Sequence, residues 1–449
     1  MSPSLLAVPC LVALAAPAPG QENVLILLAD DVGVDNIGAY AEGSDLAPTP
    51  NIDALAAAGV LFRNAWTNPV CSPTRACIQT GRQAFRHGVG TVIDTGGGWA
   101  LPLSEVTLPE LLDLHPELGY SHAAIGKWHL GNGSNGGGLS PNLAGYSHFH
   151  GCLGNFNPPW NFYDWPRWID GVPGVETTYA TTDTVDAAIA WIASAPQPWI
   201  CYVAFNAAHT PLHAPPPDLH TVPLPPNGDP RETPRPYFKA DLEAMDTEIG
   251  RLLAAIAPVL DQTLIVFAGD NGTWADVTVP PFDPGHAKLT CYEGGVNVPL
   301  IVSGPLVVAP GRESPHLVSL VDVFGTAAAV AGIDPRTTIP NVVLDSVSLL
   351  PYLVDPAAQP QRQFLYTELF GPPGFGPYAL ATRTMRDERY KLIWFETPSG
   401  KYELYDLQAD PFEQDDLLRQ SQLSPEERTA FATLRLKIDQ LLGNGGVGY

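Results

Sequence analysis

A chain of 449 residues is long enough to form two or three domains, or one large domain with a smaller piece attached. Hydrophobic residues make up 45% of the chain and charged residues 16%, which excludes a disordered or coiled-coil protein. Acidic residues outnumber basic residues 47 to 23, and the net charge of -24 argues against binding to nucleic acid or to an anionic membrane, so local cations must hold any anionic substrate.

The chain begins with a short apolar run from Leu5 to Ala16, which is followed by Ala18-Pro19-Gly20. This pattern predicts a signal peptide over residues 1–20, and therefore a periplasmic or secreted protein. Because no Lys or Arg precedes the run, a buried N-terminal helix stays the alternative. The later apolar stretch from Leu317 to Ile333 is interrupted by Asp322, so we expect no membrane-spanning helix.

The sequence has six cysteines, and removal of the signal peptide would take Cys10 with it. An odd number then remains in a compartment that permits disulfides, so at least one cysteine should have a role other than bridging. The spacings match no zinc pattern of paired C-x2-C motifs. The sequence leaves the pairing open for the other members of this set, which is Cys71, Cys77, Cys152, Cys201 and Cys291.

Several short runs rich in Val, Ile, Leu and Phe do not alternate with polar residues, as expected for buried central strands of a parallel sheet. These runs are Val24–Ala29, Ala123–Ile125, Ile200–Phe205, Leu264–Ala268 and Leu300–Val302. Helical patterns lie between them, at Asn51–Ala58, Thr182–Ser194 and Phe238–Ile256. This alternation predicts an α/β fold for residues 21–358.

Polar residues follow four of these runs directly. They are Asp30-Asp31, Lys127-Trp128-His129, the segment from Asn206 to His209, and Asp270-Asn271. Ligands of open α/β sheets bind outside the carboxyl ends of the strands. A polar residue after a single strand is most often only the start of a loop, but four such ends predict one shared site.

Asp30, Asp31, Asp270 and Asn271 offer only oxygen ligands, and three of them are carboxylates. Hard oxygen donors select Ca²⁺ or Mg²⁺, and four side-chain ligands with few waters favour Ca²⁺ over Mg²⁺. The alternative is that both pairs cap helices or turns. Their position at two strand ends favours the metal site.

Cys71 stands at the junction between a loop and a predicted helix that runs toward Gly81-Arg82. Ser72 and Thr74 are expected N-caps, and backbone amides at a helix start attract anions. Arg75, four residues after Cys71, can point back at the same site. Cys71 is therefore a candidate nucleophile beside an anion clamp, although a lone cysteine is more often a small buried hydrophobic residue.

From residue 359 onward the pattern changes to four short strands followed by a charged helix, Pro425 to Leu442. This predicts a small C-terminal α+β subdomain over residues 359–449 with an antiparallel sheet. Two Pro- and Gly-rich loops, 131–174 and 211–236, are long enough to be substrate-binding insertions. They contain Trp160 and Trp165, which could stack on a sugar ring, and His213. A hydrophobic staple under the loop explains the aromatic residues equally well.

Several segments, in one order along nearly the whole chain, resemble the type I, formylglycine-dependent sulfatases, an arylsulfatase-like family of the alkaline phosphatase superfamily. The two signatures are Cys71-x-Pro73-x-Arg75 with Thr80-Gly81-Arg82, and Gly119-Tyr120 with Gly126 to Gly131. The other matching segments are Asp30-Asp31, Thr49 to Asp53, Gly59-Val60, His209-Thr210-Pro211, Asp270-Asn271-Gly272, Lys288 and Tyr292 to Gly295.

The resemblance implies an alkaline-phosphatase-like fold, with a large mixed, mainly parallel sheet flanked by helices. It also implies that a formylglycine-generating maturation enzyme oxidises Cys71, and that the hydrated aldehyde is the nucleophile beside Ca²⁺ held by Asp30, Asp31, Asp270, Asn271 and residue 71. Arg75, Lys127 and Lys288 would neutralise the sulfate charge. His209 or Lys288 would protonate the leaving alcohol, and His129 would act as the base that releases sulfate.

The resemblance implies hydrolysis of a sulfate ester, with a sulfated small molecule or glycan as the substrate. A phosphodiesterase or phosphonate monoester hydrolase of the same superfamily is the alternative enzyme, because sulfate monoesters and phosphodiesters carry the same charge. A non-catalytic protein that binds sulfated glycans is the alternative from another class.

Overall fold

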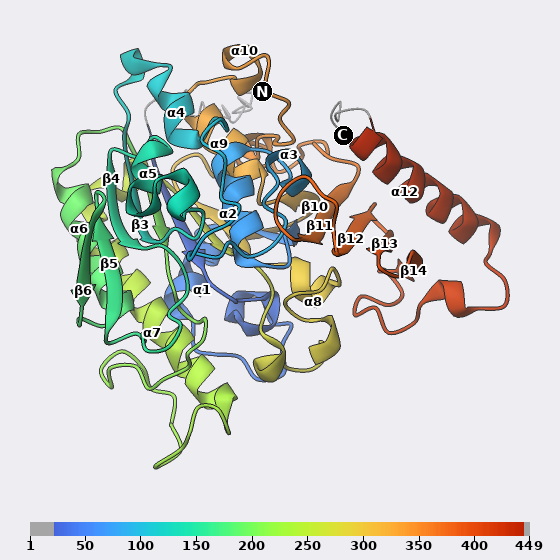
Figure 1. Ribbon diagram of the computed structural model, residues 1–449, viewed down its shortest axis with the longest axis horizontal. Coiled ribbons are helices and arrows are strands. Elements are labelled where there is room, and N and C mark those ends of the chain that lie inside the picture. Colours follow the sequence, from blue (N-terminus) through green and yellow to red (C-terminus); the bar gives the residue numbers. More distant parts are fainter. Residues whose placement is uncertain (1–21, 444–449) are drawn as a thin grey trace, which may run out of the picture.

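The structure, a computed structural model, describes residues 22–443 and contains two separate β-sheets (Figure 1). The larger sheet has ten strands in the order β10-β2-β9-β8-β1-β7-β3-β4-β5-β6, and the smaller has four in the order β11-β12-β13-β14. The large sheet is mixed and mainly parallel, and the small sheet is antiparallel, so the predicted fold is confirmed. The predicted signal peptide over residues 1–20 lies outside the described residues.

The large sheet is built around β1 (Asn23–Ala29), which pairs in parallel with β7 (Trp199–Ala204) and β8 (Thr263–Gly269). All three strands are buried along their whole length, which explains why their sequences are unbroken hydrophobic runs. The other strands of this sheet are β2 (Gly59–Trp66), β3 (Ser121–Lys127), β4 (His148–Cys152), β5 (Trp165–Ile169), β6 (Val172–Glu176), β9 (Leu300–Ser303) and β10 (Arg312–Ser319).

Two expectations about this sheet need correction. The run at Leu300–Val302 forms β9, but β9 is antiparallel to both β2 and β8. So short a hydrophobic run does not indicate whether a strand is parallel or antiparallel to its neighbours. The segment 131–174 is not a loop throughout, since it contains β4, β5 and β6. The residues of β6 are mostly exposed, so this edge strand lacks the hydrophobic run that would have predicted it. The predicted loop 211–236 is irregular as far as residue 233, and its last three residues already belong to helix α7.

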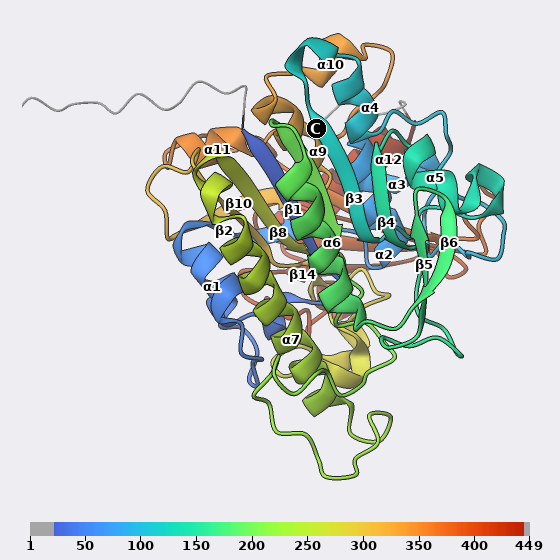
Figure 2. The ribbon, with the colours of Figure 1, turned by 90° about the vertical axis from the view of Figure 1, so that its left-hand side faces the viewer.

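Alternate residues of β1 belong to two hydrophobic cores, one on each face of the sheet. Val24, Ile26 and Leu28 face the core that includes residues of α2 (Cys71–Thr80), α4 (Leu108–Asp113) and α9 (Asp322–Val330). Leu25, Leu27 and Ala29 face the other core, which α1 (Pro50–Ala57), α6 (Ala180–Ser194) and α7 (Pro234–Ala255) cover (Figure 2). The helices therefore hold the sheet rigidly between two layers.

The second sheet consists of β11 (Leu365–Gly371), β12 (Leu380–Arg386), β13 (Tyr390–Thr397) and β14 (Lys401–Asp406). Helix α12 (Pro425–Gly443) buries Leu434 and Ile438 against it and lies at the outer side of the molecule (Figure 1). The exact boundary at residue 359 stays a prediction. The remaining short helices are α3 (Ala84–His87), α5 (Ser140–Leu143), α8 (Glu293–Val296), α10 (Pro335–Thr338) and α11 (Leu350–Val354). Within residues 22–443, no helix has both the length and the apolar composition needed to cross a bilayer.

Candidate active site

Two acidic pairs meet at the carboxyl edge of the large sheet. Asp30 and Asp31 follow β1, and Asp270 and Asn271 follow β8, its parallel neighbour, with Ala29 and Gly269 in register. The backbone amide of Asp270 donates to the carbonyl of Ala29 at 2.9 Å, and the amide of Asp31 donates to Asp270 Oδ1 at 3.2 Å. All four side chains are buried. The strand register thus brings together residues that are about half the chain apart.

Two lysines and a histidine lie against this acidic group. Lys127, the last residue of β3, forms an ion pair with Asp30 Oδ2, and Lys288 forms one with Asp31 Oδ1. His209 Nε2 lies 3.8 Å from Asp31 Oδ2, while its Nδ1 lies 2.7 Å from the carbonyl oxygen of Thr210 and donates to it. The cations therefore converge on the carboxylates from strand ends and loops on both sides of β1.

Cys71 is the first residue of α2 and is completely buried, with Val70 as the N-cap residue. Ser72 and Thr74 are not N-caps, which corrects the expectation, because the helix begins one residue before Ser72. Ser72 Oγ instead accepts from the amide of Ile93, and Thr74 Oγ1 donates to the carbonyl of Val70. The Cys71 Sγ lies 3.2 Å from His129 Nδ1, so the candidate nucleophile and the candidate base are in contact.

Arg75 is buried one helical turn after Cys71 and is fixed at several points. Its Nε and NH2 donate to Asp270 Oδ2 at 3.1 and 2.6 Å, and its NH1 donates to the carbonyl of Lys127 at 2.7 Å. Arg75 therefore holds the ends of β8 and β3 in place beside Cys71. A guanidinium held this rigidly is suited to orient a tetrahedral oxyanion.

Burial and charge shift the pKa values of this group in opposite directions. Burial and the charge of Asp30 raise the pKa of Asp270 to about 7. Burial acts in the same direction on Asp30, but Lys127, His209 and Arg75 outweigh it and hold the pKa of Asp30 well below its usual range. Burial raises the pKa of the Cys71 thiol, and burial together with Lys127 lowers that of His129, so His129 is a neutral imidazole. Crowded carboxylates of this kind repel each other unless cations lie between them.

The donor set fits a hard divalent cation. Asp30 Oδ1 and Asn271 Oδ1 are buried and accept no hydrogen bond from the residues that the structure describes. Leaving such oxygens unsatisfied is costly, and a cation would satisfy both. Ligand atoms of Asp30, Asp31 and His209 also lie within 4.8 Å of one another. Asp270 is less available, since both its oxygens accept hydrogen bonds from Arg75 or Asp31.

The three residues predicted to contact substrate are not gathered at this site. Trp165 is only 2% exposed, packs on Phe156 and donates its indole N–H to the carbonyl of Thr178, so its faces are not open to a sugar. This corrects the stacking expectation for Trp165. The rings of His213 and Phe162 stack with their centroids 4.2 Å apart, and His213 Nε2 lies 3.3 Å from Oδ1 of the buried Asp241. Trp160 is partly exposed and stays a prediction.

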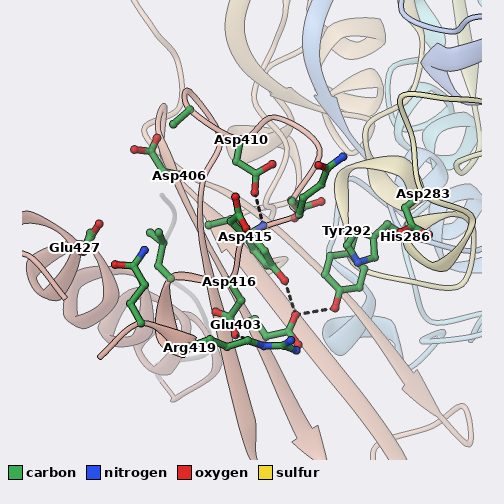
Figure 3. A pocket seen from close by; sticks show the side chains of 16 residues that line it. Asp283, His286, Tyr292, Glu403, Asp406, Asp410, Asp415, Asp416, Arg419 and Glu427 are labelled. Carbon is green, nitrogen blue, oxygen red and sulfur yellow. Dashed lines mark hydrogen bonds and ion pairs between the residues drawn. The ribbon is translucent and has the colours of Figure 1, made fainter. Parts of the chain in front are cut away.

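A cavity of about 830 Å³ lies between the loop that carries Lys288 and the C-terminal sheet (Figure 3). Its lining includes Asp283, Glu403 and Asp410 among eight carboxylates, with Arg419 as the one guanidinium. Such a wall repels sulfate esters. None of the candidate catalytic residues lines it, so the buried group around Cys71, and not this cavity, is the candidate active site.

Thr273 supports the site but was not predicted. Its Oγ1 accepts from the amide of Gly33 at 3.0 Å and from Asn36 Nδ2 at 2.7 Å, while its carbonyl accepts from the amide of Lys288 at 2.9 Å. It thereby joins the loops after β1 and β8 to Lys288. Its position directly after Asp270-Asn271-Gly272 was the available signal.

The profile of the sulfatase family matches residues 22–333, which make up about two thirds of the chain and include every candidate catalytic and metal-binding residue. The chain belongs to the sulfatase family. A second profile, the C-terminal region of N-sulphoglucosamine sulphohydrolase, matches residues 285–440, which include the small sheet and α12. The predicted family and reaction class, sulfuric ester hydrolysis, are thus confirmed.

Relatives of this sulfatase act on different sulfate esters. Human N-acetylgalactosamine-6-sulfatase is 32% identical over 389 residues, which cover 78% of this chain and 69% of the relative. Arylsulfatase A of Bos taurus is 29% identical in an alignment that covers 94% of this chain and 88% of the relative. Both relatives are named as sulfatases, in agreement with the family profile.

Two solved structures share the fold at lower identity. The complex of Ps i-CgsB with k-i-k-neocarrahexaose has a TM-score of 0.78 at 24% identity and covers 95% of this chain and 94% of that chain. A second complex, of BT4656 with its substrate D-glucosamine-2-N,6-O-disulfate, has a TM-score of 0.74 at 22% identity and covers 94% and 99%. At such identities the likeness shows the fold alone.

Proposed function

We propose that this sulfatase hydrolyses a sulfate ester of a carbohydrate or an aryl alcohol, with formylglycine made from Cys71 as the nucleophile and Ca²⁺ as the metal. Asp30, Asp31, Asp270 and Asn271 would hold the metal beside residue 71. The observation that carries this proposal is the pair of buried, unsatisfied oxygens, Asp30 Oδ1 and Asn271 Oδ1. The 32% identity to human N-acetylgalactosamine-6-sulfatase, whose name specifies a sulfated sugar, supports the carbohydrate class.

Formylglycine at residue 71 would supply a hydroxyl nucleophile, and bound Ca²⁺ would supply Lewis-acid polarisation of the sulfate ester. The chain itself supplies the positive charge that the sulfate needs. Lys127 and Lys288 reach the site as buried ammonium groups, and Arg75 is fixed by Asp270. Buried, preorganised cations stabilise developing negative charge strongly, because no solvent has to reorganise around them.

Proton transfer falls to the histidines and Lys288. His129 Nδ1, 3.2 Å from the Cys71 Sγ, can accept a proton from a group at that position. On the opposite side, both His209 Nε2 and Lys288 Nζ lie against Asp31. Either can donate a proton to the oxygen of the leaving alcohol, which therefore departs on the Asp31 side of the site.

The cellular setting of the reaction belongs to the same proposal. A maturation enzyme that oxidises Cys71 would have to act before folding is complete, since Cys71 is fully buried in the folded chain. The five described cysteines are all free thiols. We infer export to the periplasm or the medium from the pattern of residues 1–20.

Removal of the metal is expected to stop the reaction. Exhaustive treatment of the matured protein with EGTA should reduce sulfate release from 4-nitrophenyl sulfate at least about tenfold, since the carboxylates lose the cation that balances them. Added Ca²⁺ should restore the rate better than Mg²⁺. Because a bound ion stabilises the folded state, the thermal midpoint should also fall on chelation.

Two controls keep this experiment decisive. A phosphodiester with the same aryl leaving group should be hydrolysed much more slowly than the sulfate, and the reverse order would favour the phosphodiesterase alternative. Unchanged sulfate release and an unchanged thermal midpoint in metal-free protein would contradict the assignment of a metal to this site.

A further inference from the structure

A cavity of about 430 Å³ lies beside the active site, and its lining includes Thr210, Leu212, Asp229, Arg231, Trp274 and Asp276. This volume is within the range of small-molecule sites. The cavity is formed by the irregular segment after β7 and by the segment after β8. The first segment carries His209 directly before Thr210, and the second carries Asn271 three residues before Trp274, so the chain runs directly from active-site residues into the cavity walls.

Hydrogen bonds tie the walls of this cavity to both candidate proton donors. His209 Nδ1 donates to the carbonyl of Thr210, which is itself a wall residue. The amide of Lys288 donates to the carbonyl of Thr273, the residue before Trp274. His209 and Lys288 also both lie against Asp31, so the cavity walls are bonded to the two residues that can protonate the leaving alcohol.

The walls are chemically suited to an uncharged ring. Trp274 is partly exposed, and Leu212 and several prolines complete a carbon-rich surface. Arg231 donates from Nε to Asp229 Oδ1 at 3.0 Å and from NH2 to Asp229 Oδ2 at 2.7 Å. The carboxylate of Asp229 therefore balances the charge of Arg231. Asp276 is exposed and adds a negative charge. The cavity is therefore net negative and disfavours a second anionic group.

We propose that this cavity holds the ring of the leaving alcohol, with Trp274 as its stacking surface, and that it selects rings without a further negative charge. The inference rests on the proposed function and narrows it. The substrate class is then the monosulfated neutral sugar or the simple aryl sulfate, as opposed to a glycan with several sulfates or with uronic acid in this position.

The test compares matured wild-type protein and variants on two hexoses, one with a single sulfate and one that carries a second sulfate on the same ring. We expect Trp274→Ala to raise the KM for the monosulfated hexose about tenfold while kcat changes little, since stacking is lost and the chemical groups stay in place. Trp394→Ala, which removes a partly exposed Trp of the distant C-terminal sheet, should leave KM unchanged.

The charge of the cavity is tested separately. Asp276→Lys should improve kcat/KM for the disulfated hexose about fivefold relative to the monosulfated hexose. Asp261→Lys, at the opposite end of β8 near Thr263, is the matched control and should not change this ratio.

The outcomes separate the two levels of the proposal. If wild-type protein releases sulfate from both hexoses and from an aryl sulfate, but Trp274→Ala behaves like Trp394→Ala, the cavity does not hold the ring. If Asp276→Lys leaves the ratio unchanged, selection by charge is overturned. Absence of sulfate release from every compound would overturn the proposed function, and this inference with it.

Discussion

Replacement of Cys71 by Ala should reduce sulfate release by at least about 10³-fold, even after co-expression with a maturation enzyme. Alanine keeps the Cβ that would become the aldehyde carbon but lacks the thiol whose oxidation and loss create the aldehyde. The fold should persist, because the described contact of the Sγ is with His129 and the backbone of α2 does not depend on it. The assay is inorganic sulfate release, with the mass of the wild-type Cys71 peptide showing whether the thiol has been converted.

Cys77→Ala is the matched control for this substitution. Cys77 lies in the same helix, is also buried, and has its Sγ 3.3 Å from Asn68 Oδ1, away from the acidic group. The Cys77→Ala variant should release sulfate at the wild-type rate, and its small loss of stability should be similar to that of Cys71→Ala. Equal activity of Cys71→Ala and Cys77→Ala would show that Cys71 is an ordinary buried side chain.

Replacement of Lys391 by Met should destabilise the protein by about 3–5 kcal/mol, because it removes the cation beside the buried Glu413 and leaves Glu293 with Arg386 alone. Lys391 is fully buried on β13, with its Nζ 3.1 Å from Glu293 Oε1 and 2.8 Å from Glu413 Oε1. Glu293 begins α8 and also accepts from the indole N–H of Trp66 at 3.1 Å. Lys391 thus joins the C-terminal sheet to the catalytic part of the chain.

We expect Lys391→Met to lower the thermal denaturation midpoint by at least about 5 °C. Lys401→Met, an exposed position at the start of β14, should shift it little and serves as the control. Equal midpoints for the two variants would mean that the buried ion pairs contribute nothing to holding the sheets together.

Much of the fold follows from local sequence, because strands buried on both faces must be hydrophobic throughout. β1, β7 and β8 were predictable for this reason, and the polar residues after them located the rim of the site. The edge strand β6 and the direction of β9 were not predictable, since the first is mostly exposed and the second depends on which neighbours it pairs with.

The candidate site was predictable as a set of residues but not as a set of contacts. Sequence placed Asp30 and Lys127 at strand ends on one edge of the sheet, yet which carboxylate each lysine pairs with depends on side-chain packing. It also could not show that Trp165 is buried or that Trp274 lines a cavity, because both are aromatic residues in Pro- and Gly-rich surroundings. Exposure of such residues is decided by the tertiary contacts of their loops.

Residue 71 should lie next to a cation held by the acidic residues that follow β1 and β8. Long-wavelength anomalous diffraction from crystals of the matured protein grown with calcium chloride would locate that cation. We expect an anomalous peak between Asp30, Asp31 and Asn271, beside residue 71. A map without a peak there, or with calcium only in the acidic cavity lined by Asp283 and Glu403, would contradict it.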